Sequence, residues 1–241
     1  MPSGVSRETL SEIKGGVKET WAVGLGLIPL GLAFGLLMVQ SGYAWWWTPI
    51  FSTVIYAGSM EFLAINLVAT GIGPGSAALT GFMVNFRHIF YGLTYPRDQI
   101  DSAVGRAYST YALTDESYAI VSARPPGHIT GTRVLTIQIV CQLLWVIPGI
   151  IGALAGEVIP DNITGMEFAL TALFVVLAWE SFANNRDWSL PLTAVGLGVL
   201  GAVLVPGQML VLALVAYFVL LILRYRIPRL DDALKLKVGE A

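Results

Sequence analysis

Residues 76–95 read SAALTGFMVNFRHIFYGLTY and place an arginine and a histidine, Arg87 and His88, inside an otherwise apolar stretch. The stretch is about 20 residues long, which is enough for an α-helix to cross the hydrocarbon core of a bilayer. Charged side chains at that depth are costly, so they usually face the inside of a helix bundle or a water-filled path. The stretch therefore predicts a membrane carrier with a polar interior route.

The composition supports several membrane crossings. Of the 241 residues, 55% are hydrophobic and only 12% are charged, whereas a soluble domain carries roughly 25% charge. Cys141 is the only cysteine, which excludes an intrachain disulfide and a cysteine-rich metal site. Residues 1–20 are polar and lack the apolar core of a secretory signal, so we expect a short amphipathic segment on the cytoplasmic membrane surface.

Hydropathy divides the rest of the chain into apolar segments with short, turn-rich connectors. The strongest segments are residues 21–40, 45–70, 76–95, 132–155, 166–183, 190–204 and 208–223. We therefore expect an all-α polytopic membrane protein with a single transport domain over residues 21–223. A basic cytoplasmic tail would follow at residues 224–241.

The distribution of lysine and arginine bears on the number of crossings. Basic residues precede the first segment and follow the last, so both chain ends should lie in the cytoplasm. An even number of crossings satisfies this, and seven segments do not. We predict that residues 105–122 form an eighth, more polar crossing; the alternative is that one of the seven segments is re-entrant.

A faint internal repeat favours two four-helix halves. Pro29 and Pro148 lie about half a chain length apart, and each is followed by a pair of glycines spaced by four. The same offset carries Glu61 onto Glu180. Matching Pro/Gly-interrupted segments in two halves are a sequence sign of a transporter binding site, although chance alignment is the alternative in a chain this apolar.

Pro29 and Gly31 are candidates for binding the substrate through the backbone. Proline lacks an N–H and clashes with the preceding turn, so it kinks or breaks a helix. Freed carbonyl groups could then bind an ammonium group, and a half-helix N-terminus could bind a carboxylate, which suits an amino acid. The alternative is a simple kink whose glycines pack against a neighbouring helix.

Glu61 lies well inside an apolar segment. Its helical neighbours Ala57, Gly58 and Ala64 are all small, so this face can approach another helix closely. The carboxylate should then point into protein and be able to take up and release a proton near neutral pH. The alternative is a structural ion pair with Arg87 or another cation.

Asn85 and His88 share a helical face with Gly92, whereas Arg87 points elsewhere. Asn85 offers a donor and an acceptor, and the histidine side chain titrates in the physiological range. The alternative is that the crossing ends near Phe86 and that Arg87 reaches the membrane interface.

Asp115 and Glu116 lie within residues 105–122. If this segment crosses the membrane, its carboxylates must pair or line a cavity, which makes them further candidates for proton coupling. If the segment is a loop, they are ordinary solvated acids.

Enzyme signatures are missing from the sequence. It contains no zinc-protease His-Glu-x-x-His motif, no nucleophile elbow and no phosphate-binding Gly-Lys-Ser/Thr loop. We therefore expect no enzyme activity, no cofactor and no metal. A remote alternative is an intramembrane hydrolase that pairs Ser59 with His88.

Several motifs together resemble the AzlC family, the large subunit of bacterial branched-chain amino acid exporters. They are IPLGLAFG at residues 28–35, YAGSMEF at 56–62, NFRHIFYG at 85–92, TDES at 114–117 and MEFALTALF at 166–174. The resemblance implies an inner-membrane exporter of branched-chain amino acids with a small membrane partner of the AzlD type. The family pattern usually has glutamine where this chain has Glu61, a difference that could change the coupling ion or the substrate.

The leading hypothesis is a proton-coupled secondary exporter of aliphatic amino acids. Its expected substrate-binding residues are Pro29, Gly31, Gly58, Ser59, Asn85, Arg87 and His88, and its expected proton-coupling residues are Glu61, Asp115 and Glu116. The alternative is a channel, or a carrier for another small organic solute.

Overall fold

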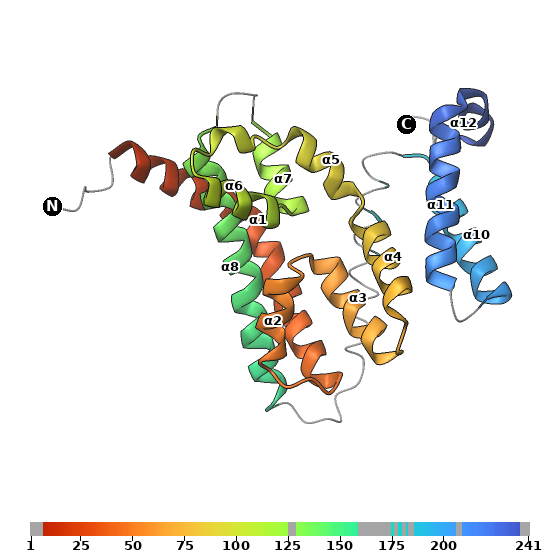
Figure 1. The fold of residues 1–241 in the computed structure, drawn as a ribbon, viewed down its shortest axis with the longest axis horizontal. Helices are drawn as coiled ribbons and strands as arrows, with labels where there is room; N and C mark the ends of the chain where they lie inside the picture. Colours follow the sequence, from red (N-terminus) through yellow and green to blue (C-terminus); the bar gives the residue numbers. More distant parts are fainter. Residues whose placement is uncertain are drawn as a thin grey trace. The chain divides into compact units, whose positions relative to one another are not determined.

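The computed structural model describes residues 7–124, 129–158, 175, 178, 179, 182, 186–205 and 209–236. Its regular elements are all helical (Figure 1). They are α1 (Arg7–Gln40), α2 (Trp47–Val54), α3 (Gly58–Ala69), α4 (Pro74–Asn85), α5 (Arg87–Thr94), the 3-10 helix η1 (Arg97–Gln99), α6 (Ala103–Tyr111), α7 (Asp115–Ser122), α8 (Gly131–Gly156), α10 (Ser189–Leu204), α11 (Met209–Arg226) and α12 (Pro228–Leu234). The expected all-α class agrees with this architecture.

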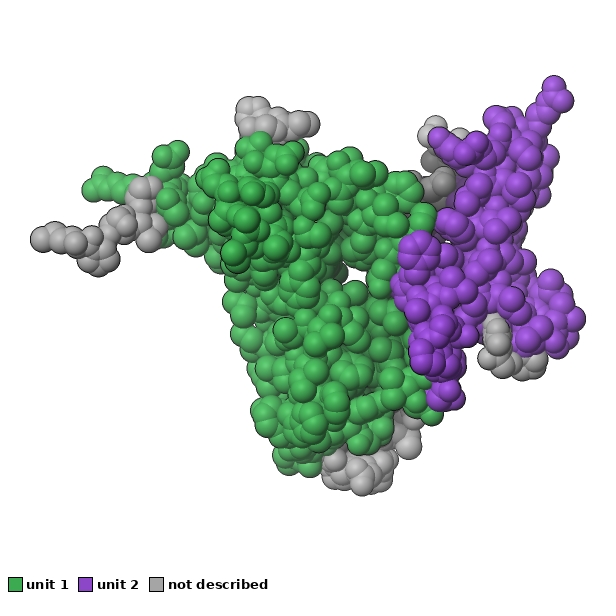
Figure 2. All heavy atoms as spheres, in the orientation of Figure 1, with its two compact units in different colours: residues 1–69, 85–167 green, residues 70–84, 168–241 purple. Residues whose placement is uncertain are grey.

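The chain forms two compact units (Figure 2). Unit 1 contains residues 1–69 and 85–167, and unit 2 contains residues 70–84 and 168–241. All the residues predicted to bind substrate or couple protons belong to unit 1.

Helices α1 and α8 form the core of unit 1 and run side by side in the same direction (Figure 1). Contacts along α1 advance together with contacts along α8, because Gly31 meets Trp145 and Gly35 meets Gly149 farther on. A Cβ atom added at Gly35 would lie 1.8 Å from the Gly149 carbonyl oxygen. Small residues therefore allow the two backbones to touch, as in membrane helix pairs.

Both prolines of the predicted repeat lie within continuous helices. Pro29 is inside α1 and Pro148 is inside α8. Pro29 was expected to kink or break its helix, and in this structure it does not break α1. A proline removes one hydrogen bond but keeps a helical φ angle, and here the close α1–α8 contact supports both helices on the side where they meet.

The breaks occur elsewhere. Residues 45–70 fold as α2 and α3, which are separated at residues 55–57, and residues 76–95 fold as α4 and α5, which are separated at Phe86. Residues 105–122, the predicted eighth crossing, contain most of one short helix, α6, and all of another, α7. Three expected crossings are thus each divided, and Arg87 lies at the beginning of a helix instead of in the middle of one.

Two described helices are long and apolar enough to cross a membrane, namely Gly131–Gly156 and Met209–Arg226. A third span results if Arg7–Trp21 and Gly24–Gln40, which meet at an angle of 63°, count as one. The total of seven or eight crossings stays a prediction. Most of the expected crossing at residues 166–183, including Glu180, lies outside the described residues.

A charged cluster joins the N-terminal part of α1 to the start of α8. Arg133, which is buried, donates to Glu12 and Glu19, and Arg124 also pairs with Glu19. The Arg133 guanidinium lies against Gly15, where a Cβ atom would be 2.1 Å from its nitrogen. This cluster fixes the N-terminal part of α1, which meets the apolar part at 63°, against the start of α8.

In unit 2, α10 and α11 pack together and a buried ion pair ties their ends. Arg224 donates to Asp187 at 2.8 Å, and the two side chains are 5% and 2% exposed. Burial opposes ionisation of Asp187, but hydrogen bonds from Ser189, from the Leu236 N–H and from Arg224 lower the pKa of its carboxyl well below the ordinary value.

Candidate functional site

The Glu61 side chain is fully buried and accepts hydrogen bonds from three parts of unit 1. Ser52 Oγ of α2 donates to Oε2 at 2.8 Å, and the Ala57 N–H, just before α3, donates to Oε1 at 3.1 Å. Trp145 Nε1 of α8 donates to both oxygens at 3.1 Å. All of these partners are neutral donors, so they favour the ionised carboxylate.

The backbone at the α2–α3 break is strained beside this carboxylate. Tyr56 has a φ of 41°, in the left-handed region that residues other than glycine seldom adopt. Such a conformation costs on the order of 1 kcal/mol or more and persists only where the surroundings enforce it. The bond from the Ala57 N–H to Glu61 and the start of α3 at Gly58 are local features that support this conformation.

Three buried aromatic rings, including the indole that binds Glu61, pack together. Phe34 of α1 meets Phe62 edge-on at 5.4 Å and stacks on Trp145 at 6.0 Å, and all three side chains are buried. Gly58 admits the indole, because a Cβ atom there would lie 3.2 Å from the Trp145 ring. Gly58 therefore takes part in this site by leaving room for Trp145.

A second polar layer lies between α6, α8 and α2. Tyr108 donates to Gln142 Oε1 at 2.8 Å, and Gln142 Nε2 donates to Tyr111 Oη at 2.9 Å. Tyr111 in turn donates to the Thr53 carbonyl oxygen, and its ring lies 5.7 Å from that of Tyr56. The layer thus reaches the α2–α3 break from the side of α6.

The sequence analysis missed the side chains that α8 contributes to the Glu61 site and to the tyrosine–glutamine layer beside it. Gln138, Gln142 and Trp145 recur at helical spacing on one face of an otherwise apolar helix. Polar residues at such spacing in an apolar crossing mark its protein-facing side, and this pattern was present in the sequence. Ser52 carried no comparable signal, because its contact with Glu61 depends on the break that follows α2.

Arg87 and Asp115 form an ion pair that joins α5 to α7. Their side chains are 41% and 34% exposed. Tyr91 stacks on Tyr118 at 4.2 Å between the same two helices, which strengthens this contact. The pairing of Arg87 with Glu61, considered from the sequence, is not observed, since Arg87 binds Asp115 instead. Glu116, the neighbouring acid, is half-buried.

His88 explains the interruption at Phe86. Its Nδ1 lies 3.1 Å from the Asn85 carbonyl oxygen and must donate, because a carbonyl can only accept. In a regular α-helix the Ile89 N–H would donate to the Asn85 carbonyl oxygen, but here it donates to the Phe86 carbonyl oxygen at 3.2 Å. Among the described residues no hydrogen bond joins His88 to Ser59, so the hydrolase alternative gains no support from this geometry.

Gly31 does not present free backbone groups on the α8 side. A Cβ atom there would lie 2.8 Å from the Trp145 carbonyl oxygen and 3.2 Å from Pro148. The face of α1 that carries Gly31 is therefore occupied by α8. Pro29 is exposed on α1, and its helix continues without a break.

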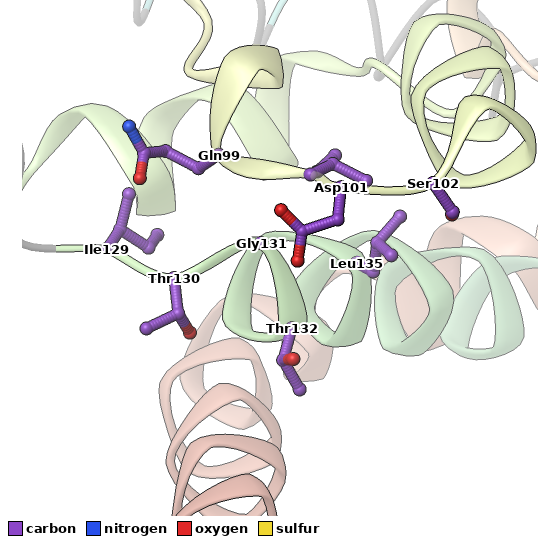
Figure 3. Close-up of a pocket in the computed structure, with 9 residues that line it drawn as sticks. Gln99, Asp101, Ser102, Ile129, Thr130, Gly131, Thr132 and Leu135 are labelled. Carbon is purple, nitrogen blue, oxygen red and sulfur yellow. The ribbon is translucent and has the colours of Figure 1, made fainter.

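A cavity of about 590 Å³ lies where the segment before α6 meets the start of α8 (Figure 3). It is lined by Gln99, Ile100, Asp101, Ser102, Ile129, Thr130, Gly131, Thr132 and Leu135. None of the predicted site residues borders it, and Asp101 brings a carboxylate that would repel an anion. In the part of the chain that the structure describes, no group of three or more metal-binding side chains comes together.

Comparisons with known proteins agree with this architecture. The family described as AzlC protein matches residues 22–159, more than half of the chain. The chain is 32% identical over 189 residues to the branched-chain amino acid transport protein AzlC of Bacillus subtilis, covering 78% of this chain and 74% of the relative. No solved structure matches the chain.

Two further relatives are membrane proteins by name. An uncharacterized membrane protein of Haemophilus influenzae is 30% identical over 213 residues, 87% of each chain. The inner membrane protein YgaZ of Escherichia coli is 29% identical over 198 residues, 78% of this chain and 80% of the relative. The chain therefore belongs to the AzlC family, and its role is membrane transport.

Proposed function

We propose that this chain carries branched-chain and other aliphatic amino acids outward across the inner membrane. The substrate class is supported by the 32% identity to the Bacillus subtilis transport protein, which extends over 78% of this chain. The sequence has no phosphate-binding loop, so we expect a secondary carrier that works by alternating access.

The buried Glu61 carboxylate is the observation that carries the proposed proton coupling. Its side chain is fully buried and its bonds come from Ser52, Ala57 and Trp145, without an ion pair among the described residues. A buried charge without a partner is costly, and binding a proton removes that cost. Asp115 and Glu116 are secondary proton candidates.

We propose that the α5–α7 contact acts as a gate. The Arg87–Asp115 ion pair is partly exposed, so it can break and re-form at low cost. Asn85 ends α4 and His88 lies in the first turn of α5, and the hydrogen bond from His88 to the Asn85 carbonyl oxygen would make both residues respond to a movement of α5. In this proposal Ser59, half-buried in the first turn of α3, contacts substrate after the gate opens.

Two further proposals concern the assembly. We propose a small membrane partner subunit of the AzlD type, and an orientation with both chain ends in the cytoplasm. Exposed basic residues lie at the end of the last long helix and after it, which fits the cytoplasmic side; they are Arg226, Arg229 and Lys235.

Counterflow of labelled valine tests the transport proposal. The chain is reconstituted into proteoliposomes loaded with unlabelled valine, with and without the small partner. We expect saturable accumulation of label that leucine and isoleucine inhibit. If no aliphatic amino acid exchanges in either preparation under any imposed gradient, the substrate proposal is wrong.

A second candidate function is transport of a different small organic solute. It is favoured by Glu61 itself, because the family resemblance leads us to expect glutamine there and a carboxylate can select a different ligand. Competition of the counterflow signal by a panel of amines and amino acids separates the two candidates. Uptake that rises linearly with concentration would instead indicate a channel.

A further inference from the structure

We propose that Glu61 binds, in alternation, a proton and the α-ammonium group of the transported amino acid. This inference rests on the proposed function and adds the group that recognises the substrate. It replaces the expectation from the sequence that backbone carbonyls after Pro29 bind this ammonium group, since the face carrying Gly31 is packed against α8.

The first argument is charge. In the described residues, no lysine, arginine or histidine forms an ion pair with Glu61. Five arginines of unit 1 have partners elsewhere: Arg87 binds Asp115, Arg124 binds Glu19, Arg133 binds Glu12 and Glu19, Arg97 binds Thr110, and Arg106 binds backbone carbonyls. A fully buried carboxylate whose charge no cation balances is a receptor for a cation.

The second argument is hydrogen bonding. The Ala57 N–H and Trp145 Nε1–H can only donate, and Ser52 Oγ donates in this structure. A proton on Glu61 needs an acceptor, so protonation must displace or reverse at least one of these bonds. An ammonium group brings three donors and a positive charge, and it can take the place of the Ser52 and Trp145 donors.

The third argument is exclusion. A proton and an ammonium group both neutralise the same carboxylate, so they cannot occupy it together. Ser52 Oγ–H and Trp145 Nε1–H, once released from Glu61, are suitable donors for the substrate's own carboxylate. Exchange of the two cations at one buried group would couple proton entry to amino acid exit.

The fourth argument is access. Glu61 is closed off in this structure, and the strained Tyr56 lies at the break beside it. The Ala57 N–H bond to Glu61 spans that break, so neutralising the carboxylate weakens the contact that holds the break closed. The break between α2 and α3 is therefore where we expect the site to open.

The tyrosine and cysteine side chains on the elements around Glu61 are neutral between about pH 5 and 7. They are Tyr56 at the break, Tyr111 of α6 and Cys141 of α8, whose ordinary pKa values are about 8.5 to 10. The apolar part of α1 that faces the site, residues 24–40, contains no titratable side chain. Glu116 of α7 interacts with Tyr56 and Cys141, so a contribution of Glu116 to the pH dependence of binding must be separated from that of Glu61 by experiment.

The test is the binding of valine to the purified full-length chain at several pH values between about 5 and 7, with proton release measured in weak buffer. For the wild type, we expect the Kd to rise as the pH falls, by up to about tenfold per pH unit at the acid end, where each bound valine displaces a proton. Valine should also bind far more tightly than 3-methylbutanoate, which lacks the amine.

Two substitutions complete the test. Glu61→Gln should give a Kd that does not change with pH, should release no proton, and should lose the preference for valine over 3-methylbutanoate. Glu61→Asp keeps a carboxylate and should retain the pH dependence with weaker binding, which separates loss of the charge from a failure to fold. Asp98→Asn, at an exposed position, is the matched control and should behave as the wild type.

The outcomes separate the two proposals. If the wild type binds no aliphatic amino acid either alone or together with the small partner, the proposed function is wrong and this inference falls with it. If the wild type binds valine but Glu61→Gln keeps the same pH dependence and the same proton release, only this inference is overturned. Glu116→Gln would then identify whether the second acid is the titrating group.

Discussion

The indole nitrogen of Trp145 donates to both carboxylate oxygens of Glu61, at 3.1 Å each, across more than eighty residues of chain. This contact fixes the first turn of α3 against α8. Helix α8 is itself packed closely against α1 through glycines, so the α1–α8 pair positions the donor side of the candidate site. The Trp145 N–H of α8 and the α2–α3 break together fix the position of the Glu61 carboxylate.

Replacing Trp145 by phenylalanine should destabilise the protein and alter transport. The ring remains but its N–H is lost, and a buried charged acceptor deprived of a donor costs about 1–3 kcal/mol. Thermal unfolding in detergent and the pH profile of valine counterflow measure the two effects. Trp47→Phe, at a partly exposed indole of α2, is the control and should change neither. A Trp145→Phe protein with wild-type stability and pH profile would contradict the role assigned to this bond.

Replacing Glu61 by glutamine should remove the pH dependence of valine transport while preserving the fold. Glutamine keeps the shape, and its single oxygen can still accept from Ser52 and Trp145, whereas its amide nitrogen cannot accept from the Ala57 N–H. The substitution therefore removes the titratable charge and this one bond. Initial rates of counterflow between about pH 5.5 and 7.5, compared with the wild type, give the measurement. An unchanged pH profile would make Glu61 a structural residue only.

Replacing Gly35 by alanine should disrupt the α1–α8 pair. The new Cβ atom would lie 1.8 Å from the Gly149 carbonyl oxygen, so the backbones must separate, at a cost of about 1–3 kcal/mol or more. Gly26 lies on the same helix with nothing within 4 Å of its added Cβ atom, so Gly26→Ala is the matched control. That control should be neutral or stabilising by up to about 1 kcal/mol. Thermal unfolding distinguishes the two variants, and equal stabilities would argue against the contact.

Removing the Arg87–Asp115 ion pair should change transport much more than stability. The two side chains are 41% and 34% exposed, and ion pairs this exposed contribute less than about 1 kcal/mol to the free energy of unfolding. Arg87→Ala and Asp115→Ala should each reduce valine counterflow, and the charge-swapped double variant should partly restore it. If the swap restores nothing while both single variants stay folded, the residues act separately and the proposed gate is wrong.

The Asp187–Arg224 ion pair should make stability depend on acid pH. The pKa of Asp187 is lower in the folded protein than the value of about 3.9 in an unfolded chain, so its contribution is fully present above about pH 4 and is lost as the pH falls through the folded-state pKa. Asp187→Asn should cost about 3 kcal/mol at neutral pH, and its difference from wild type should shrink on acidification. Asp232→Asn, at an exposed site, is the control. A difference that stays constant with pH would contradict this account.

The helical class and the polar character of the interior could be predicted from the sequence. Long apolar segments demand helices, because a bilayer offers no partner for backbone groups. The isolated Glu61, flanked by Ala57, Gly58 and Ala64, was expected to face protein, and its side chain is fully buried. These expectations depend only on local composition and helical periodicity.

The positions of the breaks could not be predicted in the same way. Prolines were expected to interrupt α1 and α8, yet both helices continue through them. The α2–α3 break falls at Tyr56, which carries no breaking signal, and the interruption at Phe86 follows from a histidine side chain that takes a backbone carbonyl. Such breaks depend on hydrogen bonds formed elsewhere in the fold.

The sequence by itself therefore determined the helical membrane class, the family and the buried acid, because each is set by local composition or by short motifs. The tertiary structure alone decided the partners: Trp145 and Ser52 for Glu61, Asp115 for Arg87, and α8 for the glycine face of α1. The physical reason is that a charge in an apolar interior is stabilised only by specific donors and counter-charges. Those come from segments distant in the chain, whose approach depends on how the helices pack.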